Sequence, residues 1–221
     1  MAKTKKAEEM KNKMEVVFIL DRSGSMEGLE ADTIGGFNST LSKQKKEGEG
    51  VIWSTVLFDD RCEVIHDRLP IEKIPQLTEN EYYVRGCTAL LDAIGRAVTN
   101  VKNLQKKSEE LPEKTLFVIT TDGMENASRE FTYEQVKKLI KTQTAKGWEF
   151  LFLGANMDAV GVAGRMGIRP EMSATYINDG EGIQKNYAAV GKVMKCLYRN
   201  DHINEEALEE VRADFRKRKK S

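Results

Sequence analysis

Two apolar segments of this 221-residue chain each end at an aspartate, and hydroxyl-bearing residues gather around both. The first segment, residues 16–20, runs into Asp21, and Ser23 and Ser25 follow on a turn that contains Gly24. One carboxylate and two hydroxyls at alternating positions are hard oxygen donors, which suit a small, hard cation such as Mg²⁺. The same residues also suit turn and N-cap chemistry before a helix, so this segment alone leaves both interpretations open.

Two further segments favour the metal. Residues 114–121 form a second strand-like run that ends at Asp122, and Thr88 lies at the start of an amphipathic segment. In an open parallel α/β sheet, ligands bind beyond the carboxyl ends of the strands, where the strand order reverses. Two strand ends and one helix start can therefore meet at one point. The sequence predicts a divalent-metal site made of Asp21, Ser23, Ser25, Thr88 and Asp122.

The order and spacing of these residues resemble the metal-ion-dependent adhesion site of the von Willebrand factor type A (vWA) domain family. The Asp-x-Ser-x-Ser triplet at Asp21 is followed by Thr88 after roughly 60 residues and by Asp122 after roughly 35 more. The resemblance covers residues 14–200, and we expect a prokaryotic-type, intracellular, single-domain member. Arg22, at the first variable position of the triplet, has no role that the pattern prescribes.

What the resemblance implies for the site is a binding mechanism. In the family the two serines coordinate the metal directly, the threonine does so in the ligand-bound state, and the aspartates act mostly through water. Carried over, Ser23, Ser25 and Thr88 would hold Mg²⁺, or Mn²⁺ or Ca²⁺, with Asp21 and Asp122 in or beside the ligand set. A cation held mainly by neutral hydroxyls attracts an external carboxylate. The expected partner is a protein that presents Asp or Glu to the metal.

Strand-like and helix-like segments alternate along the chain, which predicts an α/β protein. We expect a doubly wound, mostly parallel central sheet with helices on both faces. Residues 51–58 and 61–66 flank a turn at Asp59 as a hairpin, so one edge strand should run antiparallel. Further strands are expected at residues 16–21, 114–121, 148–154 and 171–177, and helices at residues 29–46, 88–106, 132–146, 156–167, 183–197 and 204–220.

Local signals within the predicted helices refine this picture. Thr132 and Gln135 make a capping box, and Asn156 is the expected cap of the short helix that closes at Gly167. The glycines at 35 and 36 weaken the helix that contains them, and close packing against the sheet would explain their presence.

The two ends of the chain are charged and flank one predicted domain. We expect a charged N-terminal tail at residues 1–13, a vWA-like domain at 14–200 and a charged C-terminal helix or tail at 201–221. Leu208, Val211 and Phe215 form a narrow apolar stripe that docks on the domain or on a partner. The basic residues 216–220 are better explained as a solvated end than as a nucleic-acid contact.

Composition narrows the functional classes. Thirty-five basic residues balance 35 acidic ones, so no overall field favours nucleic acid or an anionic membrane. No apolar run is long enough to span a bilayer, and the N-terminal region lacks the apolar core of a signal peptide. Three cysteines without ligand-type spacing are typical of a reducing compartment. These observations predict a cytoplasmic protein.

Two other functions compete with metal-dependent binding. A Mg²⁺-dependent phosphohydrolase on a similar sheet would use Asp21 as nucleophile, but it needs a second carboxylate two residues later, where this chain has Ser23. His66 and His202 lie outside every motif, so we do not expect an enzyme. A scaffold subunit of an intracellular RNA or ATPase complex is compatible with a binding role, because this domain would supply its interaction surface.

Overall fold

The computed structural model describes residues 14–47, 50–199, 203 and 206–219. They form a six-stranded sheet in the order β3-β2-β1-β4-β5-β6. All neighbouring pairs are parallel except β2 and β3, so the predicted mostly parallel sheet with one antiparallel edge strand is confirmed. The strands are β1 (Met14–Asp21), β2 (Val51–Phe58), β3 (Cys62–Pro70), β4 (Lys114–Thr121), β5 (Trp148–Ala155) and β6 (Ser173–Tyr176).

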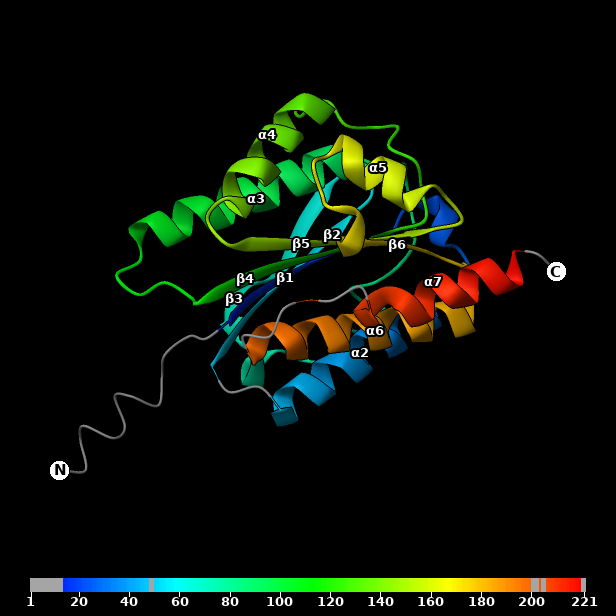
Figure 1. Cartoon of the computed structure of the whole chain (residues 1–221), viewed down its shortest axis with the longest axis horizontal. Helices are drawn as coiled ribbons and strands as arrows, with labels where there is room; N and C mark the ends of the chain where they lie inside the picture. The colour runs from blue at the N-terminus through cyan, green and yellow to red at the C-terminus, as the bar shows by residue number, and fades with distance from the viewer. Residues whose placement is uncertain (1–13, 48–49, 200–202, 204–205, 220–221) are drawn as a thin grey trace.

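Helices cover both faces of this sheet, as predicted (Figure 1). In Figure 1, α3, α4 and α5 lie above the sheet, and α2, α6 and α7 lie below it. Their bounds are α2 (Glu30–Glu47), α3 (Leu90–Lys107), α4 (Tyr133–Thr144), α5 (Ala159–Arg165), α6 (Gly180–Tyr198) and α7 (Glu206–Arg218). Because the central strands have helices on both sides, β1 and β2 are buried along their whole length, which explains why apolar residues predominate in both.

The strand order reverses at β1. From there the chain adds β2 and β3 on one side, and it then crosses to add β4, β5 and β6 on the other. The two strands that end at the predicted metal site are therefore neighbours, with Leu20 paired to Thr120. Aromatic packing anchors β1 from below, since the Phe18 ring stacks on Trp53 at 4.6 Å and meets Phe37 of α2 edge-on.

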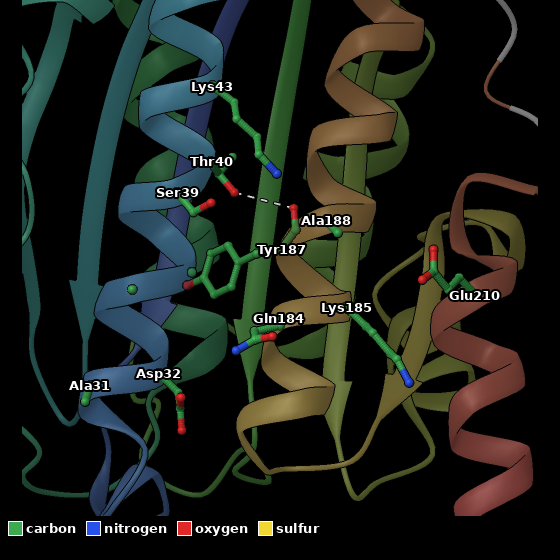
Figure 2. A pocket seen from close by; sticks show the side chains of 12 residues that line it. Ala31, Asp32, Ser39, Thr40, Lys43, Gln184, Lys185, Tyr187, Ala188 and Glu210 are labelled. Atoms are coloured by element: carbon green, nitrogen blue, oxygen red, sulfur yellow. Dashed lines mark hydrogen bonds between the residues drawn. The ribbon is translucent and has the colours of Figure 1, made fainter.

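Close packing between α2 and α6 (Figure 2) explains the second of the paired glycines of α2, whereas a Cβ atom on Gly35 would meet nothing within 4 Å. A Cβ atom on Gly36 would lie 2.2 Å from the Tyr187 ring of α6, so only glycine lets that ring seat against α2. The close approach is therefore to α6, where the sequence suggested the sheet. Beside this contact a groove of about 590 Å³ runs between the two helices, lined by small and polar residues of α2 and α6 and by Glu210 of α7.

The predicted caps of α4 and α5 hold with one correction. The capping box of Thr132 and Gln135 opens α4 as expected. The cap of α5, however, is Asp158, whose side chain accepts a hydrogen bond of 3.0 Å from the Gly161 amide. Asn156 instead adopts a left-handed conformation with φ 51°, which takes it out of the helix start and into the bend after β5.

The C-terminal helix α7 docks on the domain. Leu208 and Val211 are buried, and α7 packs against α6 and β6. Arg212 donates hydrogen bonds to the backbone carbonyls of Pro170, Glu171 and Ser173 beside the edge strand. The predicted N-terminal tail and residues 204 and 205, where the last helix is predicted to start, lie outside the described residues, and the domain limits stay a prediction.

No helix in the described part of the chain is long and apolar enough to cross a membrane. The three cysteines are all free thiols, with Cys87 exposed beside Thr88 and the other two half-buried.

Candidate metal centre

The structure brings all five predicted site residues together at the carboxyl ends of β1 and β4. Thr88 Oγ1 donates a hydrogen bond of 3.0 Å to Ser23 Oγ, which lies 3.2 Å from Ser25 Oγ. Ser25 Oγ in turn donates to Asp122 Oδ1 at 2.5 Å. Asp21 joins through its Oδ1 atom, which accepts from the Ser23 amide at 2.7 Å. The result is a continuous cluster of side-chain oxygens, called the oxygen cluster below.

Local backbone contacts hold the three segments of the oxygen cluster in place. The Gly24 amide donates to the Gly86 carbonyl at 3.1 Å. This bond ties residues 22–25, called the serine loop below, to the segment before Thr88. Gly123 lets the loop after β4 approach, because a Cβ atom there would lie 2.4 Å from Thr88 Oγ1 and 3.2 Å from Ser25 Oγ. Any larger residue at position 123 would push into the cluster.

The loop after β4 also clamps Thr88. Asn126 Oδ1 accepts from the Thr88 amide at 2.9 Å, and the Thr88 carbonyl accepts from the amides of Asn126 and Ala127. The Glu125 carboxylate accepts from the Leu91 amide at 2.9 Å and from Ser128, so it caps the start of α3. Thr88 therefore lies in a fixed loop two residues before α3, which begins at Leu90 and not at residue 88 as predicted.

The spacing of the oxygens fits an octahedral Mg²⁺ ion. Adjacent ligands bonded to Mg²⁺ at about 2.1 Å lie about 3 Å apart. The two hydroxyl–hydroxyl separations, 3.0 Å and 3.2 Å, match this value. Within the described residues no three His, Cys, Asp or Glu side chains gather at a potential metal site. The donor set here is of another kind, with three hydroxyls and two carboxylates.

Burial raises the pKa of both carboxylates of the oxygen cluster. Asp21 is only 1% exposed, and burial raises its pKa to about 6 against hydrogen bonds from Ser23 and Thr121 that lower it. Burial also raises the pKa of Asp122, although hydrogen bonds from Ser25 and Asn178 oppose the shift. Asp21 is buried and Asp122 is half-buried, so desolvation of these two acids forms a place where a cation would be stabilised.

Three neighbours that the sequence analysis missed hold the aspartates. Thr121 Oγ1 donates to Asp21 Oδ2 at 2.5 Å, and the Tyr82 hydroxyl donates to the Asp21 carbonyl at 2.5 Å. Asn178 Nδ2 donates to Asp122 Oδ2 at 2.8 Å. Asn178 follows β6, so the rule that polar residues after parallel strands share one edge could have found it. Tyr82 lies in the long irregular segment before Thr88, where no periodicity gave a signal.

Arg22 has a structural role that the motif does not prescribe. Its side chain is buried, and its Nε donates to Asp59 Oδ2 at 2.9 Å. Arg85 donates to the same oxygen at 2.7 Å, and Arg22 also pairs with Glu63 at 2.7 Å. Burial alone would raise the pKa of Asp59, but hydrogen bonds from Arg85, the Arg61 amide and Arg22 outweigh it and lower the pKa.

Comparison with protein-family models and with curated proteins finds no match to this sequence. Solved structures do match. The D319A mutant of the PilB minor pilin from Streptococcus sanguinis aligns with TM-score 0.61 and 12% identity, over 87% of this chain and 64% of that chain. The von Willebrand factor domain of the type V pili tip protein Mfa5 from Porphyromonas gingivalis aligns with TM-score 0.60 and 10% identity, over 84% of this chain and 96% of that one.

A third match is proximal thread matrix protein 1 from the mussel byssus, in a structure with a zinc-occupied MIDAS motif. It aligns with TM-score 0.54 and 14% identity, over 84% of this chain and 46% of that chain. This chain thus spans less than two thirds of the pilin and less than half of the mussel protein. At such identities the likeness concerns the fold alone. The strand order and these neighbours together show that the chain has a vWA-like α/β fold.

Proposed function

We propose that this protein is a divalent-metal-dependent protein-binding module, in which the metal holds an Asp or Glu side chain of a protein partner. The observation that carries the proposal is the oxygen cluster, whose separations fit an octahedral ion and whose two acids, one buried and one half-buried, have raised pKa values. Mg²⁺ is the first choice, because hard hydroxyl and carboxylate oxygens are its preferred ligands, and Mn²⁺ or Ca²⁺ are alternatives.

In this proposal Ser23, Ser25 and Thr88 hold the metal, and Asp21 and Asp122 lie in or beside the ligand set. The bound cation supplies a strong, directional contact for an incoming carboxylate. Ser25 and Gly24 are exposed, whereas Asp21, Ser23 and Thr88 are buried. The partner would therefore approach over the serine loop.

The surroundings of Asp21 support binding over hydrolysis. As a nucleophile in a phosphohydrolase, Asp21 would need a free oxygen facing the substrate. Instead Oδ1 accepts from the Ser23 amide and Oδ2 from Thr121, and the side chain is buried. We therefore propose a non-enzymatic role. Purified protein with Mg²⁺ should not hydrolyse phosphomonoesters, nucleotides or phosphodiesters above background, and turnover that disappears in Asp21→Asn would reverse this conclusion.

The partner and its setting are also proposals. We propose a cytoplasmic location, which the three free thiols support, and a scaffold role in an RNA or ATPase complex remains compatible with the same binding surface. An affinity pull-down from cell lysate, run once in Mg²⁺ and once in EDTA, tests the binding role. We expect mass spectrometry to find proteins enriched in Mg²⁺ that Asp122→Ala fails to capture. Equal capture in both buffers would contradict a metal-dependent module.

A matched control separates the metal from general charge effects. Asp158 lies in the loop after β5, outside the oxygen cluster, and caps α5. Because asparagine caps helices as well as aspartate does, Asp158→Asn removes one negative charge from the same edge without weakening the helix. This variant should capture the same partners as the wild type.

A further inference from the structure

Each aspartate of the oxygen cluster has one oxygen directed to the cluster and one held by a neighbouring side chain. For Asp122, Oδ1 accepts from Ser25 and Oδ2 accepts from Asn178 Nδ2 at 2.8 Å. We infer that Asn178 is a positioning residue of the metal centre, which fixes the rotation of the Asp122 carboxylate so that Oδ1 faces the hydroxyls. This inference rests on the proposed function and adds a sixth side chain to the site.

The loop between β6 and α6 holds Asn178 from both sides. Its amide donates to Asn156 Oδ1 at 3.4 Å, and Asn156 is itself held by a hydrogen bond of 3.0 Å to the Tyr176 carbonyl. The next residue, Asp179, caps α6 by accepting from the Gly182 amide at 2.9 Å. With its backbone fixed on either side, Asn178 can hold the Asp122 carboxylate in a defined place.

An amide is the chemistry that positions a carboxylate without neutralising it. A lysine or arginine at this place would pair with Asp122 and compete with a metal ion for its charge. The Asn178 amide group is neutral, so it fixes one carboxylate oxygen and leaves the full negative charge available to a cation. Thr121 does the same for Asp21, as a neutral hydroxyl donor at 2.5 Å.

A second observation concerns the oxygen atom of the Asn178 side-chain amide. Asn178 Oδ1 is buried and has no hydrogen-bond partner within the described residues. Asn38 shows the usual arrangement, because its Nδ2 donates to the Leu77 carbonyl and its Oδ1 accepts from the Leu77 amide, both at 2.8 Å. An unsatisfied buried acceptor destabilises the fold, because it has lost its hydrogen bonds to water without replacing them.

The orientation of the Asn178 amide follows from Asp122. Turning the amide over would place Oδ1 against Asp122 Oδ2, which brings two acceptors into contact. The unsatisfied oxygen is thus the consequence of holding the carboxylate. A bound water is the ordinary way in which such a buried acceptor is satisfied.

The experiment measures Mg²⁺ and Ca²⁺ affinity of the full chain by calorimetry for wild type and Asn178→Ala. Mg²⁺ demands near-ideal octahedral geometry, whereas Ca²⁺ tolerates irregular ligand positions. A carboxylate freed to rotate should therefore weaken Mg²⁺ binding by about tenfold, the scale expected for a group that orients a ligand. Ca²⁺ binding should fall much less. Unchanged Mg²⁺ affinity, or equal losses for both ions, would overturn the inference.

A control variant and a metal-free readout complete the test. Asp158→Asn is the control, because it lies outside the oxygen cluster and keeps the cap of α5. We expect it to leave the ratio of Mg²⁺ to Ca²⁺ affinity unchanged. A crystal structure of metal-free Asn178→Ala should show the Asp122 carboxylate rotated, and an unmoved carboxylate would overturn the inference even if the wild type binds no metal.

Discussion

Two buried polar clusters share the loop that follows β1, and their side chains alternate along it. Asp21 and Ser23 belong to the oxygen cluster, whereas Arg22 between them points into an ion-pair cluster with Asp59, Arg85 and Glu63. In the ion-pair cluster two guanidinium groups meet two carboxylates. In the oxygen cluster the hydrogen bonds to the two carboxylates come from hydroxyl groups, a side-chain amide and a backbone amide.

The pKa values of the two buried aspartates, Asp59 and Asp21, shift in opposite directions because their hydrogen-bond donors differ in charge. The arginines around Asp59 lower its pKa despite burial, while burial without a cation raises the pKa of Asp21 to about 6. A charge-matched cluster stabilises the folded chain. A cluster with uncompensated acids carries a cost that a metal ion would remove, which is the expected trade between stability and function.

The largest expected effect on stability comes from breaking the ion-pair cluster. Asp59→Ala leaves Arg22 buried without its main partner, which should lower the free energy of unfolding by about 3–5 kcal/mol. Urea denaturation measures this change. Glu63 also pairs with Arg22 but is half exposed, so Glu63→Ala should cost less than about 1 kcal/mol. A small loss in Asp59→Ala would mean that the two clusters do not differ as described.

Removing a negative charge from the oxygen cluster should raise the stability of the metal-free protein, in contrast to breaking the ion-pair cluster. The pKa of Asp21 rises from 3.8 to about 6 on folding, so at pH 7 its ionised form destabilises the metal-free fold by about 3 kcal/mol at most. The protonated carboxyl of Asp21 stabilises the fold below pH 4, and this stabilisation is lost as the pH rises through about 6. Asp21→Asn should therefore be more stable than wild type at pH 7.5 and not at pH 4, in urea titrations with EDTA. Lower stability at pH 7.5 would contradict the raised pKa.

The Thr88→Ala variant separates the affinity for the metal from the affinity for the partner. Thr88→Ala removes one neutral ligand and leaves both serines and both aspartates, so metal affinity should weaken modestly. Partner affinity at saturating Mg²⁺ should fall roughly a hundredfold, about 2.7 kcal/mol, because the metal would rely more on Asp122 and attract a carboxylate less strongly. The partner captured in Mg²⁺ serves as the probe. Affinity within twofold of wild type would make the metal structural and place the interaction surface elsewhere.

The sequence predicted the oxygen cluster because its information is local. Asp21, Ser23 and Ser25 follow a strand-like run directly, and Asp122 follows another. The rule for parallel strand ends and the resemblance in order and spacing to the vWA motif together predicted the cluster. Periodicity likewise predicted α6, whose stripe from Ile183 to Leu197 is buried.

What the sequence did not reveal depends on contacts between distant segments. Arg22 acquires its role only because the hairpin turn brings Asp59 against the serine loop. Asn156 and Asp158 are both good helix caps. The left-handed conformation of Asn156 takes it out of the helix start, so Asp158 caps α5. Asn178 was a loop residue without a motif, and its contact with Asp122 required the placement of β6 beside β5.

Calorimetric titration of the full chain with Mg²⁺ or Mn²⁺ tests the metal centre most directly. We predict one site in the wild type and in Asp158→Asn, and no measurable binding in Asp21→Ala or Asp122→Ala, with circular dichroism showing that all four proteins are folded. Binding of the metal to Asp21→Ala with the affinity of the wild type would contradict the assignment of the oxygen cluster as the metal site.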